Sequence, residues 1–361
     1  MKTVIADKIA SVAQHRGLKR KLQVSAEIPC EEGVLLAVRI LNSKSSYNTL
    51  ELTSGRMAKV RRGDIIVGAL GHRKALFGYS GHLPSQLSPG DTVQVLNIGG
   101  VIGICDSVNA NFGPPFDAEV LGTVLEFPYL GERIGVPARA GTDQLEMNAA
   151  IDTRAVPVVV LAGTSMDSGK TAAASAIVSR LRHYGHTVDA FKATGVSLRR
   201  DILAMEDAGA RQTAIFTDFG VVTTTEENGP PVTRMMLTQL AADKPDVIVF
   251  ELGDGLLGAY GVEAILKDEG IRSAITCLVL CANDPVAAWG GVKLLHDEFS
   301  LSPDVITGPA TDNLVGTNLI TDRLGLPAFN AITHGTELGD AVAKVINLQV
   351  DGENDLNGEP S

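Results

Sequence analysis

A strand, a glycine-containing loop and a helix follow one another near the middle of this 361-residue chain. Val156–Leu161 is a continuous apolar run, typical of a strand that is buried on both faces of a parallel sheet. The loop from Gly163 leads into a helical pattern over Gly169–Tyr184, and Gly185 stands where a C-cap glycine belongs. This order predicts a doubly wound α/β domain whose functional groups gather at the carboxyl ends of its strands.

The loop has the composition of a phosphate cradle, the P-loop. Its glycines let successive backbone N–H groups turn toward phosphate oxygens, and the helix N-terminus adds the positive end of its dipole. Lys170 is expected to contact the terminal phosphates, and the Thr171 hydroxyl to ligate Mg²⁺. The predicted nucleotide-binding residues are Gly163, Thr164, Ser165, Met166, Asp167, Ser168, Gly169, Lys170 and Thr171.

One position departs from the strict P-loop pattern, which places glycine six residues before the lysine. Here that position is Thr164, and the glycine is Gly163. The form Gly-Thr-x4-Gly-Lys-Thr resembles dethiobiotin synthetase and the cobyrinic acid amide-forming synthetases. These enzymes belong to the P-loop class that also contains the nickel-insertion GTPases and the septum-site ATPases. The resemblance covers roughly residues 156–330.

Two further stretches carry the same resemblance. Phe191–Gly195 looks like a strand-end segment in which a lysine precedes a Ser/Thr-Gly pair, which implies catalytic roles for Lys192 and Thr194. We expect the strand of Lys192 to lie next to the P-loop strand. Phe250–Leu257 resembles the Glu-Gly-Ala-Gly-Gly segment, whose glutamate, here Glu251, helps to bind magnesium.

Both segments follow apolar runs, and a carboxylate at the end of such a run is costly to bury unless it meets a cation. In the glutamate segment, Leu252 and Asp254 replace small residues. Asp254 is therefore a candidate for metal binding or for contact with a different substrate.

A charged stretch follows Lys192 and contains Arg199, Arg200, Asp201, Glu206 and Asp207. The resemblance implies that an aspartate of this region joins the magnesium shell. Asp201 and Asp207 are the candidates, with Asp207 preferred because it precedes Ala208-Gly209-Ala210. The two arginines are candidates for a bidentate clamp on a substrate carboxylate, and an exposed charged helix start is the alternative.

The nucleotide base has a weaker signature. Thr307–Asn313 follows a predicted strand and is expected to approach the base. The guanine-reading motif Asn-Lys-x-Asp is absent, since Asn283-Asp284-Pro285 does not match it. We therefore expect ATP and Mg²⁺ as cofactors.

The first third of the chain has a different pattern. Residues 1–20 are predicted to form one helix, with Ile5, Ile9 and Val12 at helical spacing. Short β-rich runs then alternate with turns, and two runs open with Gly-Asp, at Gly63 and Gly90, which suits a small barrel or sandwich. The predicted strands are Gly33–Leu41, Asp64–Leu70, Thr92–Ile98, Val101–Cys105 and Ala118–Leu125.

These patterns divide the chain into a β-rich domain over 1–145, a P-loop domain over 155–348 and a disordered tail over 350–361. The irregular segment Pro137–Arg154 is the expected junction.

Composition excludes several classes of protein. Lys and Arg number 31 and Asp and Glu 42, a net charge of −11, which argues against nucleic-acid binding. No apolar run is long enough to span a bilayer, and the N-terminus lacks a signal-peptide core, so we expect a cytoplasmic protein. Cys277 and Cys281 lie in an apolar run and are predicted to be buried rather than metal-binding.

A basic cluster stands out in the β-rich domain and is a candidate for docking an anion, although a solvated surface is the simpler interpretation. His72 and His82 have no evident catalytic partner. The cluster comprises Arg56, Lys59, Arg61, Arg62, His72, Arg73 and Lys74.

The sequence thus predicts an ATP- and Mg²⁺-dependent enzyme that activates a small carboxylate or carbamate by phosphoryl transfer. The resemblance implies ligation to form a C–N bond. A small-molecule kinase and a nucleotide-switched assembly factor or metallochaperone are the alternatives. We expect a small-molecule substrate and a homodimer, without nucleic acid or membrane as partners.

Overall fold

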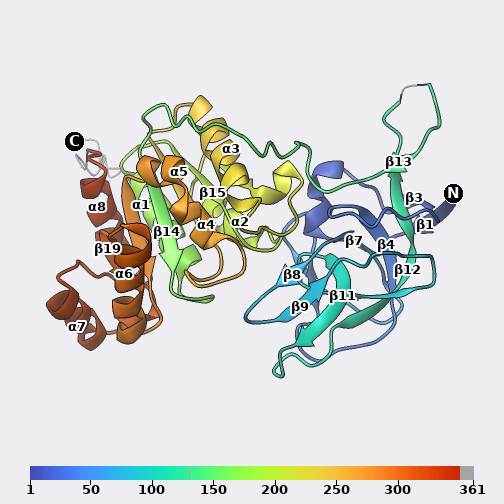
Figure 1. Ribbon diagram of the computed structural model, residues 1–361, viewed down its shortest axis with the longest axis horizontal. Helices are drawn as coiled ribbons and strands as arrows, with labels where there is room; N and C mark the ends of the chain where they lie inside the picture. Colours follow the sequence, from blue (N-terminus) through green and yellow to red (C-terminus); the bar gives the residue numbers. More distant parts are fainter. Residues whose placement is uncertain (130, 350–361) are drawn as a thin grey trace, which may run out of the picture. The chain divides into compact units, whose positions relative to one another are not determined.

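The computed structural model describes residues 1–129 and 131–349, so the disorder expected for 350–361 falls outside the described residues. The described residues form two compact units (Figure 1). The first comprises Met1–Leu145, Gly195–Arg200 and Phe216–Asn228. The second comprises the remaining segments, beginning at Glu146. The boundary lies within the expected junction, but two short segments from the expected P-loop domain belong to the first unit.

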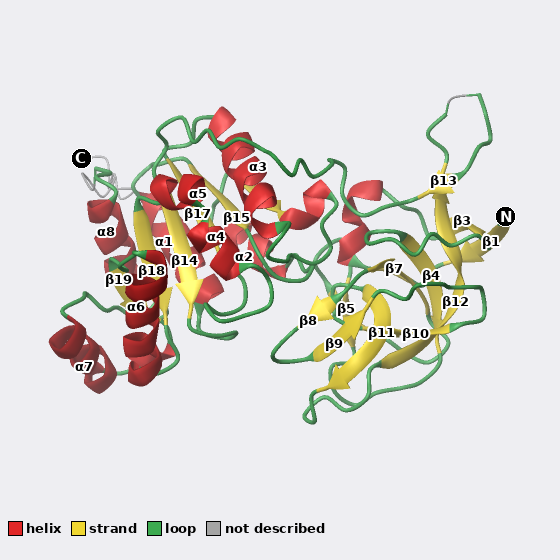
Figure 2. Ribbon diagram, in the orientation of Figure 1, coloured by secondary structure: helices red, strands yellow, loops and turns green. Residues whose placement is uncertain are grey.

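Five strands of the first unit form a closed ring. β12 pairs with β4, β4 with β7, β7 with β11, β11 with β10, and β10 again with β12. All these pairs are antiparallel except β7 with β11. A closed ring leaves no free edge among its members, which identifies a small barrel rather than a sandwich (Figure 2).

The strands of the first unit are β1 (Lys2–Ile5), β2 (Lys8–Ile9), β3 (Lys21–Ser25), β4 (Leu35–Ile40), β5 (Thr49–Glu51), β6 (Met57–Lys59), β7 (Ile65–Leu70), β8 (Arg73–Lys74), β9 (Tyr79–His82), β10 (Thr92–Val95), β11 (Val101–Val108), β12 (Phe116–Glu126) and β13 (Val136–Pro137). Two 3₁₀ helices accompany them, η1 (Ser11–Arg16) and η2 (Phe216–Phe219).

The two Gly-Asp turns that open β7 and β10 are built alike. Gly63 and Gly90 have φ angles of 90° and 98°, in the left-handed region that favours glycine. The carboxylate of Asp64 accepts a hydrogen bond from the backbone N–H three residues before it, and Asp91 does the same, each at 2.7 Å. The repeated Gly-Asp pair in the sequence therefore marks the same kind of turn before two barrel strands.

The predicted helix over residues 1–20 is wrong. The segment contains β1, β2 and η1 instead. Alternate residues explain the difference, because Val4 and Ala6 are buried whereas Ile5 is 63% exposed. The helical spacing of Ile5, Ile9 and Val12 is incidental to a strand that pairs with β3.

The second unit contains a sheet of six parallel strands in the order β16-β15-β17-β14-β18-β19. Their bounds are β14 (Val158–Gly163), β15 (Val188–Lys192), β16 (Gln212–Ile215), β17 (Val247–Glu251), β18 (Cys277–Cys281) and β19 (Val305–Thr307). The helices are α1 (Lys170–His183), α2 (Arg200–Asp207), α3 (Gly229–Ala242), α4 (Val262–Lys267), α5 (Glu269–Ala274), α6 (Pro285–Phe299), α7 (Leu314–Leu324) and α8 (Gly335–Val345), with the 3₁₀ helix η3 (Pro309–Thr311).

Both faces of this sheet are covered. Val159 and Leu161 of β14 pack in one core cluster with residues of α1 and α8. The alternate residues Val158 and Val160 are equally buried on the opposite face, where α3 contacts β17 and α6 contacts β18. The predicted doubly wound parallel sheet is confirmed.

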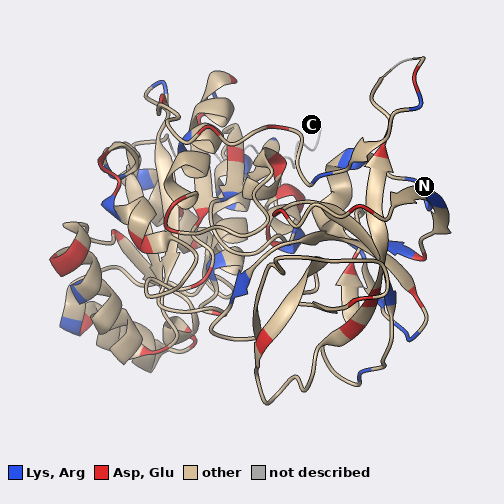
Figure 3. Ribbon diagram, turned by 45° about the vertical axis from the view of Figure 1, so that its right-hand side comes forward, with Lys and Arg blue, Asp and Glu red and all other residues tan. Residues whose placement is uncertain are grey.

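The burial of the two cysteines agrees with the sequence prediction. Cys277 and Cys281 are buried, and burial raises the pKa of Cys281 to about 12, so this thiol stays protonated. Acidic and basic residues are interspersed along the elements of each unit (Figure 3). Within the described ranges, none of the helices combines the length and apolar composition needed to cross a bilayer.

Gly68 provides a test of the barrel. A Cβ on this β7 residue would come closer than 3.0 Å to the carbonyl oxygen of Gly100. We expect Gly68→Ala to destabilise the protein by about 2 kcal/mol, because backbone must move to accept the methyl group. Urea unfolding measures the loss. Gly290→Ala in α6 is the control, since open space surrounds that position and its stability should not fall.

Candidate nucleotide-binding site

The loop between β14 and α1 forms a tight cradle within the second unit. Asp167 and Gly169 adopt left-handed φ angles of 57° and 87°. A Cβ on Gly163 would come closer than 3.0 Å to both the Ser168 hydroxyl and the Lys170 ammonium. Gly163 is therefore a glycine that this loop requires, which accounts for the departure from the strict pattern at Thr164.

Lys170 is folded back into the cradle. Its side-chain ammonium donates to the carbonyl oxygens of Ser165, at 2.9 Å, and Asp254, at 2.6 Å. The residue is only 5% exposed. The position of this charge, inside the curl of the loop, is where a P-loop lysine meets phosphate oxygens. The sequence did not predict that the carbonyl of Asp254 holds it.

Glu251 ends the central strand β17 and faces the first turn of α1. Its Oε2 accepts a hydrogen bond of 3.0 Å from the Thr171 hydroxyl. The residue is 3% exposed, and its pKa is raised chiefly by burial and further by Asp201. Lys192 and Lys170 oppose this shift. A buried carboxylate beside a hydroxyl provides the hard oxygen ligands that Mg²⁺ prefers.

Lys192 ends β15, and it lies two strands from the P-loop strand rather than next to it. The register pairs Glu251 with Lys192 on one side and with Leu161 on the other. The expected adjacency was wrong because β17 inserts between β15 and β14. Glu251 consequently stands between the end of β15, which carries Lys192, and the end of β14, whose following loop leads to Lys170 at the start of α1.

The ammonium of Lys192 forms an ion pair with Asp201, in the first turn of α2. Both side chains are nearly buried, at 9% and 11% exposure. Asp207, at the other end of α2, is exposed. Of the two aspartates proposed for the magnesium shell, the geometry favours Asp201, because it raises the pKa of Glu251 by proximity.

The segments after β15 and β17 pack against each other. The Thr194 hydroxyl donates to the Gly253 carbonyl at 2.8 Å, and a Cβ on Gly253 would clash with the Thr194 backbone. Thr194 thus positions the glutamate loop. Leu252, which replaces a small residue of the resembling family, is buried at 1% exposure.

Asp254 is buried with a left-handed φ of 74°. No hydrogen bond of good geometry reaches its carboxylate oxygens, although the nearby backbone of Gly255 and Ala259 lowers its pKa. Burial has the larger effect and raises that pKa. Lys170 and Lys192 also lower this pKa, so the Asp254 carboxylate lies within electrostatic range of both lysines.

The remaining predicted site residues lie in several places. Arg199 belongs to the first unit, where its backbone N–H donates to Glu51 and its guanidinium donates to the Thr53 carbonyl. Arg200, at the start of α2, also belongs to that unit, and Glu206 is exposed. The substrate clamp stays a prediction.

The segment proposed to approach the base lies beside the cradle. A Cβ on Gly308 would come closer than 3.0 Å to the carbonyl oxygens of Ser168 and Ala282. The 3₁₀ turn η3 follows, and its Ala310 N–H donates to the Ala282 carbonyl at 2.9 Å. This contact to the P-loop agrees with a position near the base.

The basic cluster of the first unit is partly structural. Arg73 is 4% exposed, and its guanidinium donates to the Leu96 carbonyl and the Tyr47 hydroxyl. His72 accepts a hydrogen bond from the backbone of Leu83. His82 pairs with Asp106 at 2.7 Å on the surface.

Comparison with models of protein families and with curated proteins finds no match. Solved structures include weak likenesses. A DUF1611 family protein from Anabaena variabilis is 17% identical over 59% of this chain and 65% of its own, with a TM-score of 0.41. The signal recognition particle receptor FtsY of Elizabethkingia anophelis is 13% identical over 53% of this chain and 66% of its own, with a TM-score of 0.37.

The hydrogenase maturation factor HypB of Archaeoglobus fulgidus is 12% identical over 53% of this chain and 91% of its own, with a TM-score of 0.36. The chain thus spans just under two thirds of the first two proteins. The fold therefore rests on the chain's own geometry. Its parallel sheet and its β14–loop–α1 cradle are those of a P-loop NTPase fold.

The raised pKa of Glu251 predicts how its loss affects the protein without metal. A raised carboxyl pKa contributes stability below the ordinary value of 4.5, and that stability is lost as pH rises through the higher folded value. We expect Glu251→Gln, which still accepts from Thr171, to raise the melting temperature at pH 7 and to leave it unchanged at pH 4. Thermal unfolding in chelator at both pH values measures this, with Glu298→Gln, at an exposed position of α6, as control. A variant less stable at pH 7 contradicts it.

Proposed function

We propose that this protein binds a magnesium nucleoside triphosphate, preferentially ATP, and transfers its terminal phosphoryl group to a small acceptor. The observation that carries the proposal is the convergence of Lys170, Lys192 and the Thr171–Glu251 pair at the carboxyl ends of β14, β15 and β17. Ligands of parallel α/β sheets bind at such an edge.

The residues present fit a magnesium ion. Glu251 and Thr171 offer oxygen ligands 3.0 Å apart, and Asp201 lies close enough to raise the pKa of Glu251. Burial without a full cation partner is costly for a carboxylate, and a divalent ion would remove that cost. Bound magnesium supplies charge neutralisation between the phosphates.

The chain's own residues supply the rest by position and charge. Lys170 would exchange the carbonyls of Ser165 and Asp254 for phosphate oxygens, while the loop N–H groups hold the nucleotide. Lys192 lies across Glu251 from the cradle and would face the group in transfer. Charge that develops on a moving phosphoryl group is stabilised by such fixed cations.

A second lysine at the site supports transfer to an acceptor. The resemblance to dethiobiotin synthetase and its relatives extends this proposal to a ligase, in which a carboxylate or carbamate is phosphorylated and an amine then forms a C–N bond. A small-molecule kinase shares the first step. An assembly factor or metallochaperone would instead hydrolyse the nucleotide slowly, without stimulation by a small acceptor.

Lys170→Ala tests nucleotide binding. We expect the variant to fold normally and to lose at least about tenfold in affinity for a non-hydrolysable ATP analogue, because a charge on the terminal phosphates disappears. Calorimetry with magnesium measures the affinity, and Lys267→Ala on the exposed surface of α4 is the control. If Lys170→Ala bound the ATP analogue as tightly as the wild type, the assignment of this loop as a phosphate-binding P-loop would be wrong.

Lys192→Ala separates an enzyme from a switch. We expect near-normal nucleotide affinity but about a 10²-fold loss of acceptor-stimulated ADP release, the usual effect of losing a transition-state charge contact. A screen of amines and carboxylic acids identifies the acceptor. Lys267→Ala on the exposed surface of α4 is again the control and should keep wild-type stimulation. A loss of nucleotide affinity with unchanged stimulation would make Lys192 an anchor and favour the switch.

A further inference from the structure

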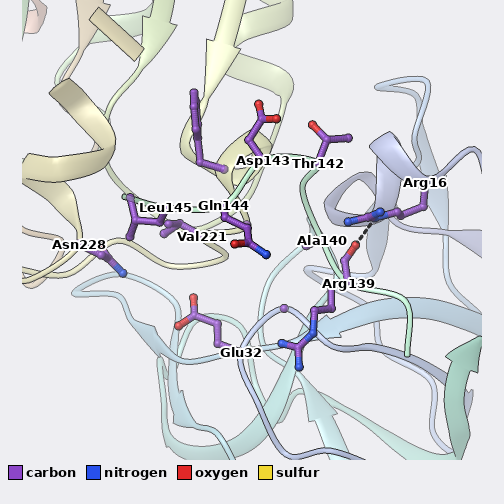
Figure 4. Close-up of a pocket in the computed structure, with 13 residues that line it drawn as sticks. Arg16, Glu32, Arg139, Ala140, Thr142, Asp143, Gln144, Leu145, Val221 and Asn228 are labelled. Atoms are coloured by element: carbon purple, nitrogen blue, oxygen red, sulfur yellow. Dashed lines mark hydrogen bonds between the residues drawn. The ribbon is translucent and has the colours of Figure 1, made fainter. Parts of the chain in front are cut away.

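A cavity lies in the first unit, and every residue that lines it belongs to that unit. Its volume is about 470 Å³, within the range of small-molecule sites. The side chains of Glu32, Gln144 and Asn228 surround the open centre of the view in Figure 4. The lining comes from η1, from Glu32 and Gly33 just before β4, and from two segments, 139–145 and 219–228.

The walls of this cavity are fixed by backbone contacts. The N–H of Ala140 donates to the Gly33 carbonyl at 2.8 Å, and that of Thr142 donates to the Asp218 carbonyl at 2.9 Å. A Cβ on Gly141, where φ is 74°, would come closer than 3.0 Å to the backbone of Gly220. The two loops therefore pack without side chains between them, and the cavity is preformed.

Both arginines of the lining already have partners. Arg16 donates from Nε to the Arg139 carbonyl at 2.5 Å, marked by the dashed line in Figure 4, and its guanidinium lies 3.5 Å from Glu126. Arg139 forms an ion pair with Glu31. Each positive charge is thus matched by a carboxylate outside the lining.

The carboxylates of the lining are not matched in this way. Oε1 of Glu32 accepts from the N–H groups of Val222, at 3.0 Å, and Thr223, at 2.8 Å. No described residue donates to its Oε2. Burial raises the pKa of this group, against the lowering effects of these two N–H groups and of nearby His72. Asp143 adds a second carboxylate, whose backbone alone is hydrogen-bonded, to Asp218. The carboxylate oxygens of Glu32 and Asp143 can therefore accept further hydrogen bonds, and their charge favours a positively charged donor.

The rest of the lining includes the apolar side chains of Leu145, Phe219 and Val221. We propose that this cavity binds a small molecule through a primary amino group, whose ammonium donates to Glu32, with Asp143 adding negative charge to the lining, while its apolar part packs on these three side chains. The proposal concerns the first unit alone and does not depend on phosphoryl transfer.

Three probes of one shape test it. Benzylamine, benzyl alcohol and benzoate carry an ammonium, a neutral hydroxyl and a carboxylate on the same ring. Saturation-transfer NMR titrations on the full-length protein at pH 7.5 measure their affinities. We expect benzylamine to bind at least about tenfold more tightly than the other two, since a charge-assisted hydrogen bond distinguishes it.

Glu32→Gln retains an oxygen for the two backbone N–H groups and should lower benzylamine affinity about tenfold. Glu119→Gln, which lies on β12 and pairs with Arg39, is the matched control and should bind normally. Should Glu32→Gln fail to fold, Asp143→Asn, whose carboxylate accepts no hydrogen bond from the described residues, is expected to weaken benzylamine binding severalfold. Lys170→Ala should leave benzylamine binding unchanged, so a failed nucleotide assay does not affect this result.

Equal affinity for the three probes, or wild-type binding by both carboxylate variants, overturns the proposal.

Discussion

The buried Glu251 carboxylate is the group on which the arrangement of the nucleotide site depends. It ends the strand that lies between the P-loop strand and the strand of Lys192, and it is hydrogen-bonded to the first turn of α1. A carboxylate at 3% exposure would be strongly unfavourable without compensation. Two lysines and a threonine hydroxyl provide part of it, and the pKa remains raised. The charged form of Glu251 is therefore only partly compensated by these three groups.

Glycine is what lets the surrounding loops approach this charge. Gly163, Gly253 and Gly308 each leave no room for a Cβ, and the atoms that a Cβ would meet belong to the cradle, to the end of β15 and the segment after it, or to Ala282 after β18. Gly163 ends β14, and Gly253 and Gly308 closely follow the ends of β17 and β19 in the same sheet. The phosphate cradle and the loops after β15, β17 and β19 therefore contact one another through backbone, which favours fixed geometry over adaptability. Preorganisation of this kind suits catalysis by charge and position.

The sequence predicted the elements whose pattern is local. The apolar strands of the sheet, helix α1 and the paired Gly-Asp turns are where the residues placed them. The order of the strands in the sheet is not determined by local sequence, since the residues of β15 and β17 do not indicate which of the two pairs with β14. For the same reason the position of Lys192 relative to the cradle was misjudged. The preference for Asp207 over Asp201 stays a prediction, although the ion pair of Asp201 with Lys192 favours Asp201. The helix predicted for residues 1–20 failed because pairing with β3 decided the burial of Val4. Glu32 gave no signal, because its surroundings come from segments nearly two hundred residues away.

The central claim is that Glu251 and Thr171 complete a metal site when a nucleotide is bound, and Mn²⁺ reports on it directly. Electron paramagnetic resonance can titrate Mn²⁺ into the full-length protein with and without a non-hydrolysable ATP analogue. The account predicts one site per chain that tightens when the nucleotide is present and weakens at least about tenfold in Glu251→Gln, because a neutral amide is a poor ligand for a hard cation. An Mn²⁺ affinity that is the same with and without the nucleotide, or the same in Glu251→Gln as in the wild type, would contradict the account.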